Sequence, residues 1–245
     1  MGVGSKFGIL AETGNNIVTD GLVFNMDAAA YKSYPRTGTN IYNLASGSLT
    51  PTGSMDGSGW EGINPTSSFT FDGVDDQINL SDYYPSVAPD TGLTFNIWMK
   101  INAAAGDPTR AWGTIISNWN DQNYCFIGTQ LNNPTNIQVY FDGSLKFTFS
   151  TSEGIAYQTW FNMVITQNGG TSNGDIIGYI NGVQKKTGTD KLPTQTSGVT
   201  SIGYDINRGN YPFLGEIASL QIYNRALSAA EVLQNYNAGK DRFGL

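Results

Sequence analysis

The sequence predicts an all-β protein, a sandwich of two antiparallel sheets with one short helix at its C-terminal end. Short apolar runs recur between segments rich in Gly, Asn, Ser and Thr, and 30 of the 245 residues are glycine, which is typical of many strands joined by turns. One run, 93–101, has large apolar side chains at every second position, as a strand with one buried face requires. A helix-capping pattern occurs near the end of the chain, at 228–231.

The strands follow one another as apolar or alternating runs. They are predicted at 21–27, in two segments of 69–80, and at 93–101, 114–117, 124–130, 136–141, 146–150, 160–167, 176–180, 183–185, 199–204 and 213–223. The odd positions of 93–101 are Leu93, Phe95, Ile97, Met99 and Ile101. We expect them to face the core from the middle of a sheet. Residues 28–68 contain three prolines and predict a loop-rich excursion with one or two short strands.

One turn is specified by its residues. Asn181-Gly182 lies between two strand-like runs, and Asn-Gly readily supplies the two positive φ angles of a type I′ turn. We therefore expect 176–180 and 183–185 to form a hairpin about these two residues.

The predicted helix has recognisable ends. Ser228 and Glu231 have the spacing of a capping box, in which each side chain accepts from the backbone N–H of the other residue. Val232, Leu233 and Tyr236 share one face of the helix that follows, and Gly239 is placed to end it. We expect this helix to lie across the end of the sandwich.

Composition excludes several classes of protein. The formal net charge is −7 and no run of Lys or Arg interrupts it, so a nucleic-acid partner would be repelled. The single cysteine, Cys125, excludes an intrachain disulfide and reads as a small buried residue. No signal peptide and no apolar span of about 20 residues is present, which predicts synthesis in the cytoplasm and no membrane insertion.

Residues 1–19 are predicted to be an N-terminal arm, and 20–245 one domain. The arm is rich in Gly and aperiodic, but it contains an apolar cluster formed by Phe7, Ile9 and Leu10. Two interpretations are open: a solvated terminus, or an extended arm that docks on a neighbouring subunit through these three side chains.

The residues for catalysis are missing. The sequence has no histidine, and therefore lacks the usual general base and the commonest transition-metal ligand. A glycosidase needs two carboxylates facing each other across the scissile bond. The chain has five glutamates: Glu12, Glu61, Glu153, Glu216 and Glu231. None lies in a strand with a paired-glutamate pattern, and Glu231 is explained as a cap. We expect no enzymatic activity.

The densest carboxylate cluster is formed by Asp72, Asp75 and Asp76. Asp72-Gly73 favours a tight turn, so a purely structural role explains the cluster. A calcium site is the alternative, because carboxylate oxygens are the ligands that calcium prefers. No other cofactor is required by the sequence.

Aromatic residues in loop-like segments suggest a carbohydrate site. A sugar ring offers an apolar C–H face surrounded by hydroxyls, so a site for it needs a flat aromatic ring beside amides and carboxylates. The candidate ligand-binding residues are Trp112, Trp119, Asn120, Asp121, Tyr204, Asn207 and Arg208, with Tyr211 near them in sequence. The alternative is that these rings fold back onto the sandwich.

Four motifs in order resemble the laminin-G-like, concanavalin-A-like jelly-roll family. They are the opening strand at 21–27, F-T-F-D-G-V-D-D at 69–76, Y-I-N-G at 179–182, and the strand-to-helix ending at 215–231. The resemblance implies a jelly-roll sandwich, and it implies calcium at a sandwich edge in many members. A paired-glutamate strand, known from laminarinase-like relatives, is not matched.

The amino-acid sequences of 17–23 and 223–228 are most similar to those of domains in tailed-phage virion proteins. The expected function is therefore a non-catalytic structural protein of the virion surface, a decoration or fibre component with a glycan-binding, lectin-like domain. Its partners would be virion proteins, cell-surface glycans and further copies in a homo-oligomer. The alternative is a free carbohydrate-binding module of a bacterial surface or secreted protein; a glycoside hydrolase is the third candidate.

Overall fold

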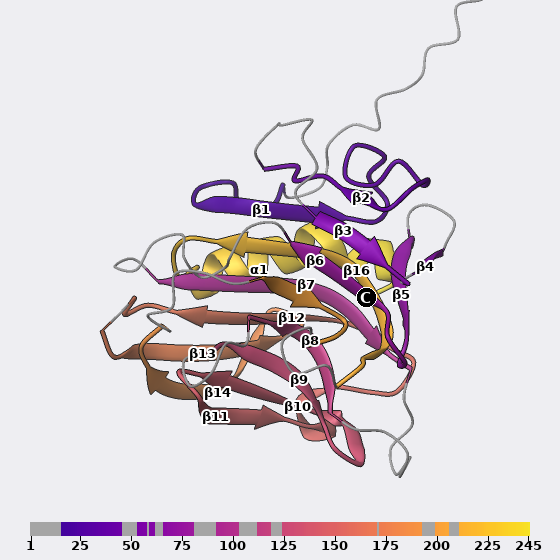
Figure 1. Cartoon of the computed structure of the whole chain (residues 1–245). Coiled ribbons are helices and arrows are strands. Elements are labelled where there is room, and N and C mark those ends of the chain that lie inside the picture. Colours follow the sequence, from indigo (N-terminus) through magenta and orange to yellow (C-terminus); the bar gives the residue numbers. More distant parts are fainter. Residues whose placement is uncertain are drawn as a thin grey trace, which may run out of the picture.

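The two predicted sheets are present. The computed structural model describes residues 16–45, 53–57, 59–61, 66–80, 92–102, 112–118, 124–170, 172–192, 199–205 and 211–245. These residues form two antiparallel sheets of eight strands each, stacked as the two layers of a sandwich (Figure 1). The predicted all-β jelly-roll sandwich with a short C-terminal helix is confirmed.

Strands far apart in sequence lie side by side in both sheets. Sheet A has the order β14 (Val183–Asp190), β13 (Gly174–Ile180), β12 (Trp160–Gln167), β7 (Leu93–Ile101), β16 (Leu214–Tyr223), β5 (Ser68–Asp72) and β4 (Gly59–Glu61), and β1 (Leu22–Asp27) also pairs with β16. Sheet B has the order β11 (Ser144–Phe149), β10 (Asn133–Phe141), β9 (Phe126–Gln130), β8 (Gly113–Ser117), β15 (Thr200–Ile202), β6 (Gln77–Leu80), β3 (Gly53–Asp56) and β2 (Asn40–Ile41). The helices are η1 (Thr151–Glu153), α1 (Ala229–Gly239) and η2 (Lys240–Phe243).

Two predicted extents were wrong. In the described part of 28–68, three short strands, β2, β3 and β4, precede β5, rather than one or two. β14 continues to Asp190, beyond the predicted end at 185, because pairing with β13 holds it as far as the pair Gly174–Asp190. Neither the short strands of 28–68 nor residues 186–190 have an apolar pattern of their own. Pairing with neighbouring strands, rather than local sequence, therefore determines that they are extended.

The odd positions of β7 enter the main core, as predicted. Leu93, Phe95, Ile97, Met99 and Ile101 are all buried in the cluster between the two sheets. β7 lies between β12 and β16 in sheet A, so it is a central strand.

Three even positions of β7, Thr94, Asn96 and Trp98, are buried as well, on the face that carries the C-terminal helix. Asn96 belongs to a row of amides that crosses the outer face of sheet A. Asn162 Nδ2 donates to Asn96 Oδ1 at 2.7 Å, and Asn96 Nδ2 donates to Gln221 Oε1 at 2.9 Å. Gln221 Nε2 continues the row to Asn25 Oδ1 at 3.3 Å. Because these amides bond to one another, the sheet can bury them at low cost.

Helix α1 covers the outer face of sheet A instead of closing the end of the sandwich, which corrects the predicted position (Figure 1). The capping box is confirmed: Glu231 N–H donates to Ser228 Oγ at 3.3 Å, and Ser228 N–H donates to Glu231 Oε2 at 2.8 Å. Val232 is fully buried, whereas Leu233 is 46% exposed. The predicted apolar face was therefore wrong at Leu233.

Gly239 ends α1, but the chain continues into η2. Its φ is −109°, so the left-handed residue that terminates the helical segment is Gly244, with φ 72°. Beyond Gly239 the chain lies over Trp98, whose ring stacks on Phe243 at 4.5 Å and on Tyr236 at 5.8 Å between centroids. Trp98 is thus covered by the helical segment rather than open to a ligand.

Residues 16–19, which the sequence assigns to the arm, contact the domain. Val18 is 8% exposed, and its N–H donates to Asn235 Oδ1 at 2.8 Å. Its carbonyl accepts from the Tyr223 hydroxyl at 3.0 Å. Gln234 Nε2 donates to the Asn16 carbonyl at 2.8 Å. The packed part of the chain therefore begins by residue 16, and the docking residues Phe7, Ile9 and Leu10 lie outside the described residues.

The last strands of the two sheets meet along one side of the sandwich. β11 lies beside β14, and ion pairs cross this seam. Lys146 pairs with Asp190, and Lys191 Nζ lies 3.3 Å from Asp142 Oδ2. From η1, Glu153 Oε1 lies 3.0 Å from Lys186 Nζ.

The Asn181-Gly182 hairpin is confirmed. Asn181 has φ 52° and Gly182 has φ 74°, as the predicted type I′ turn requires. Among the residues with described structure, no helix is long and apolar enough to cross a membrane.

Candidate functional site

An aromatic patch lies on the outer face of sheet B. We define it as Trp112, Tyr124, Phe126, Tyr140 and Tyr211. Trp112, Tyr140 and Tyr211 are partly exposed, whereas Tyr124 and Phe126 are 8% and 3% exposed. The patch therefore has a buried base and three rings that reach solvent.

Strand alternation directs these rings outward. In β10, Ile137, Val139 and Phe141 enter the core, so Gln138 and Tyr140 between them face away from it. The same rule turns Phe126 outward in β9, because its neighbour Ile127 belongs to the core cluster. The neighbouring strands place Phe126 directly opposite Tyr140.

A glycine makes room for the base of the patch. A Cβ atom at Gly128 would lie 2.4 Å from Phe126 Cζ and 2.6 Å from the Gly113 carbonyl oxygen. The Phe126 ring therefore lies over the β9 backbone at Gly128, where any larger residue would displace it.

The rings meet edge to face. The Trp112 centroid lies 6.3 Å from both Phe126 and Tyr140, and 6.4 Å from Tyr211. The corresponding interplanar angles are 67°, 65° and 67°. Edge-to-face pairs at these distances are favourable, so the four rings hold one another in place.

Tyr211 adopts an unusual backbone conformation. Its φ is 75°, in the left-handed region that bulky residues rarely occupy. The Tyr211 carbonyl accepts from Thr114 N–H at 2.8 Å, which joins it to the start of β8 beside Trp112. Strain of this kind is found most often where a side chain must be held for function.

Neutral polar groups surround the rings. Gln138 Oε1 accepts from the Tyr140 hydroxyl at 3.4 Å, and Asn136 Nδ2 donates to Gln130 Oε1 at 2.9 Å. Burial raises the pKa of Tyr140, so its hydroxyl remains a protonated donor. Amides beside a partly exposed ring are the combination that recognises sugar hydroxyls.

The structure places only part of the predicted ligand-binding set. Trp112 lies in the patch, together with Tyr211, which the sequence placed near the set. Tyr204 is half-buried after β15, beside the fully buried Asp205, whose Oδ2 accepts from Ser117 Oγ at 3.2 Å. The other predicted residues lie outside the described residues: Trp119, Asn120, Asp121, Asn207 and Arg208.

Sequence reasoning missed three members of the patch: Tyr124, Phe126 and Tyr140. Tyr140 carried a usable signal, since it is an aromatic residue on the polar face of an alternating strand. Tyr124 and Phe126 carried none, because their side chains flank a buried cysteine and read as core.

The carboxylates of Asp72, Asp75 and Asp76 come together at the β5–β6 turn, with one oxygen of each within 4.8 Å of the others. Two of the oxygens bind the turn itself. Asp76 Oδ2 accepts from Asp72 N–H at 2.7 Å, and Asp72 Oδ1 accepts from Val74 N–H at 2.8 Å. Burial, followed by repulsion from the neighbouring carboxylates, raises the pKa of Asp76. The donor set suits calcium in kind, but the turn alone accounts for its geometry.

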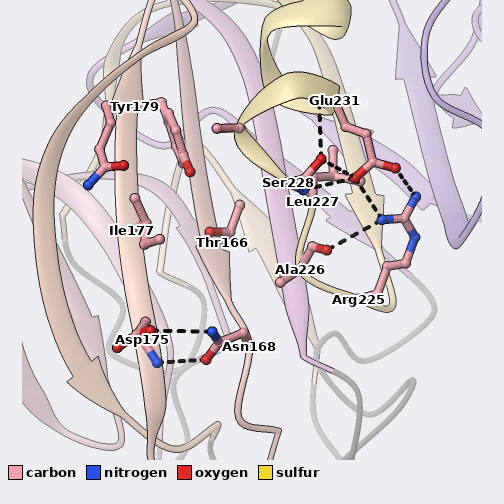
Figure 2. A pocket seen from close by; sticks show the side chains of 12 residues that line it. Thr166, Asn168, Asp175, Ile177, Tyr179, Arg225, Ala226, Leu227, Ser228 and Glu231 are labelled. Atoms are coloured by element: carbon pink, nitrogen blue, oxygen red, sulfur yellow. Dashed lines mark hydrogen bonds and ion pairs between the residues drawn. The ribbon is translucent and has the colours of Figure 1, made fainter.

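A groove of about 550 Å³ lies on the other sheet, between β12–β14 and the corner that leads into α1. Figure 2 shows that its polar groups bond mainly to each other. Arg225 binds Glu231 at 2.6 and 3.0 Å, and Asp175 N–H donates to Asn168 Oδ1 at 2.7 Å. Tyr179, its aromatic residue, is 2% exposed and offers no ring face. With its polar groups bonded to one another and no exposed ring face, the groove is less suited to a sugar than the patch.

Three glutamates are held as anions. Burial would raise the pKa of Glu153, but hydrogen bonds from Lys186 and Ser150 outweigh it and lower the pKa to about 2. The pKa of Glu231 is also about 2, chiefly because of Arg225. Burial opposes the same shift at Glu216, where hydrogen bonds from Lys100 and other neighbours lower the pKa. A general acid needs the opposite shift.

The two-layer antiparallel sandwich is the fold of the lectin-like class of domains. The family model Laminin_G_3, of the concanavalin A-like lectin/glucanases superfamily, matches residues 72–233. The chain belongs to this superfamily, as the four motifs indicated. No curated protein matches the sequence.

Solved structures share the fold at low sequence identity. The binding domain of botulinum neurotoxin serotype D is 16% identical, with a TM-score of 0.65 over 89% of this chain and 52% of that one. The binding domain of Paraclostridial Mosquitocidal Protein 1 is 16% identical, with a TM-score of 0.68 over 90% of this chain and 52% of that one. A third similar structure is domain 4 of AbnA, an arabinanase of Geobacillus stearothermophilus, in complex with arabinotriose. It is 16% identical, with a TM-score of 0.61 over 88% of this chain and 98% of that one. The chain thus spans about half of each toxin binding domain and nearly all of the arabinanase domain.

Proposed function

We propose that this chain is a non-catalytic, glycan-binding domain and that the aromatic patch is its binding site. The observation that carries the proposal is the cluster of three partly exposed rings, Trp112, Tyr140 and Tyr211, beside neutral amides. An exposed ring face attracts the C–H face of a sugar, and amides bond its hydroxyls.

The state of the carboxylates supports a role without catalysis. Hydrolysis of a glycosidic bond needs one carboxyl group that stays protonated near neutral pH and a second one facing it. Glu153, Glu216 and Glu231 are ion-paired with lowered pKa values. Asp76 has a raised pKa, but it lies in the β5–β6 turn and no ring of the patch contacts it.

The neighbours in fold support the proposal by analogy. The arabinanase domain was solved with a bound trisaccharide, and the toxin domains are named for binding. At 16% identity this likeness concerns the fold alone, so the site must be tested in this chain.

We place the domain on the virion surface, as a decoration or fibre component made in the host cytoplasm. Support comes from the amino-acid sequences of 17–23 and 223–228, which resemble those of tailed-phage virion proteins. Residues 1–15 would attach it to a capsid or tail protein, or to another copy, through Phe7, Ile9 and Leu10. A free carbohydrate-binding module of a bacterial surface or secreted protein is the alternative.

The binding proposal is tested by a glycan array, followed by titration of the best ligand into three proteins. Trp112→Ala should weaken binding at least tenfold. Tyr31→Ala is the matched control, because Tyr31 is 66% exposed and follows β1 of the other sheet. Equal affinities for wild type and Trp112→Ala, with both folded by circular dichroism, would reject the patch as the site.

The virion proposal needs a separate experiment. Full-length protein and a version lacking residues 1–15 are mixed with particles that lack the protein, and sedimented. Full-length protein alone should co-sediment, while both forms melt at similar temperatures because Val18 and its contacts are retained. Failure of the full-length protein to bind any particle fraction would favour the free module.

A further inference from the structure

We infer that the aromatic patch takes a neutral glycan in the form of a single, soluble chain. This inference rests on the proposed function and narrows its ligand. It draws on two observations: the charge of the side chains around the rings, and the angles between the rings.

The described surface around the patch is mostly uncharged. The uncharged residues on the outer face of β9, β10 and β11 beside the rings are Gly128, Gln130, Asn136, Gln138, Leu145 and Thr148. Within this part of the described structure, none of them can pair with a carboxylate, sulfate or phosphate of a ligand.

Among the described residues, the charged groups on the neighbouring strands would not help an acidic ligand. Asp205 is fully buried beside Ser117, which pairs with Phe126 across β8 and β9. Lys146 and Lys191 lie at the end of β10 and β11 that carries Tyr140, and both are held in ion pairs, with Asp190 and Asp142. With a formal charge of −7 on the whole chain, a polyanionic glycan would be repelled.

Amide side chains are the groups that can hydrogen-bond the hydroxyls of a neutral sugar. Gln138 and Gln130 each carry both a donor and an acceptor; Gln130 is partly exposed on the outer face of sheet B, and Gln138 is 7% exposed beneath Tyr140 on the same face. Their hydrogen bonds to Tyr140 and Asn136 hold the side chains in place. Fixed amides can therefore bond hydroxyls without a charge on either partner.

The ring angles exclude a flat ligand surface. Trp112 is inclined by 65° to Tyr140 and by 67° to Tyr211. A crystalline polysaccharide presents one plane, which could not lie on Trp112 and on either tyrosine at once. A single chain can twist between successive sugars, so it can place different ring faces against Trp112 and the tyrosines.

The test uses three kinds of probe with the full chain: soluble neutral polysaccharides and arabinotriose, soluble acidic ones such as polygalacturonate, and insoluble crystalline cellulose and chitin. Affinity electrophoresis or calorimetry measures the soluble probes, and sedimentation measures the insoluble ones. We expect binding to at least one neutral soluble probe, little change of affinity between low and high salt, and loss of at least tenfold in Trp112→Ala and Tyr140→Ala. Gln184→Ala, in the groove on sheet A, is the matched control and should bind normally.

The outcomes separate the two proposals. Salt-dependent binding to acidic probes, or binding to crystalline ones, would overturn the inference but leave glycan binding intact. Loss of binding to acidic probes in Arg208→Ala would identify Arg208, which lies outside the described residues, as the charge that binds them. Binding to no probe of any kind would overturn the proposed function itself.

Discussion

Gly239 of helix α1 lies directly against the indole of Trp98 in β7. A Cβ atom at this position would stand 2.6 Å from Trp98 Nε1 and 2.9 Å from Cε2. The close contact lets the end of the helix approach sheet A, where the indole stacks on the rings of Tyr236 and Phe243.

Replacing Gly239 by Ala should therefore destabilise the fold. Alanine favours a helix over glycine by about 1 kcal/mol, but overpacking a filled site costs about 1–3 kcal/mol. We expect the second effect to win and the free energy of unfolding in urea to fall. In a Trp98→Leu background the added methyl group has room, so the same change should become neutral or stabilising. An equal loss in both backgrounds would contradict the contact.

Asn235 joins the helix to the sheet and to the first described residues. It is 1% exposed, its Nδ2 donates to the Tyr223 hydroxyl at 3.0 Å and its Oδ1 accepts from Val18 N–H. Asn235→Leu should cost about 1–3 kcal/mol, because a buried N–H loses its acceptor. Chemical denaturation measures the loss. Leu233→Ala, at an exposed position of the same helix, should change stability by no more than about 0.5 kcal/mol.

Phe95 tests the face of the central strand. It is 1% exposed in the main core, so Phe95→Ala should lower the free energy of unfolding by about 3–5 kcal/mol. Val183→Ala is the comparison at a 54% exposed position. A loss under about 1 kcal/mol for Phe95→Ala would mean that the strand faces the other way.

Acid should weaken the fold through two glutamates. The folded-state pKa values of Glu153 and Glu231 are about 2, below the ordinary value of 4.5. The stability that they contribute is therefore fully present above pH 4.5, and it is lost as the pH falls toward 2. Melting temperatures between pH 6 and pH 3 should fall less steeply in Glu231→Gln than in wild type. Glu61→Gln, at an exposed position, should follow the wild-type curve.

Calcium binding at the β5–β6 turn remains a prediction. If Asp72, Asp75 and Asp76 hold the ion, calcium at 100 times its dissociation constant should stabilise the folded state by about 2.7 kcal/mol. Melting curves with calcium and with a chelator measure this. Asp75→Asn should abolish the difference, and Asp175→Asn, on the other sheet, should not. Identical curves for wild type under both conditions would leave the cluster a structural turn.

Much of the fold could be predicted from local patterns. The alternation of 93–101, the Asn181-Gly182 turn and the Ser228–Glu231 capping box each act over a few residues, so the sequence alone carries their signal. The position of α1 could not be predicted this way. Asn235 reads as a surface residue, and only the distant partners Val18 and Tyr223 make it a buried one.

The candidate site was predicted only in part, for a similar reason. Trp112 stands out as a tryptophan between a loop and a strand. Its contacts with Phe126, Tyr140 and Tyr211 come from three separate segments, and no spacing along the chain brings them together. The strain at Tyr211, a non-glycine residue at positive φ, likewise arises from tertiary contacts.

The contact between the edge strands β11 and β14 bears on whether neighbouring molecules can associate through their sheet edges. The last strand of a sheet can recruit a strand from another chain, and crowding many copies on one support favours such growth. Here the two last strands face each other, and Lys146–Asp190 and Lys191–Asp142 cross between them. A neighbouring molecule would have to break these charge pairs before adding a strand at that side. This side of each sheet is thus less open to the addition of a strand from another molecule.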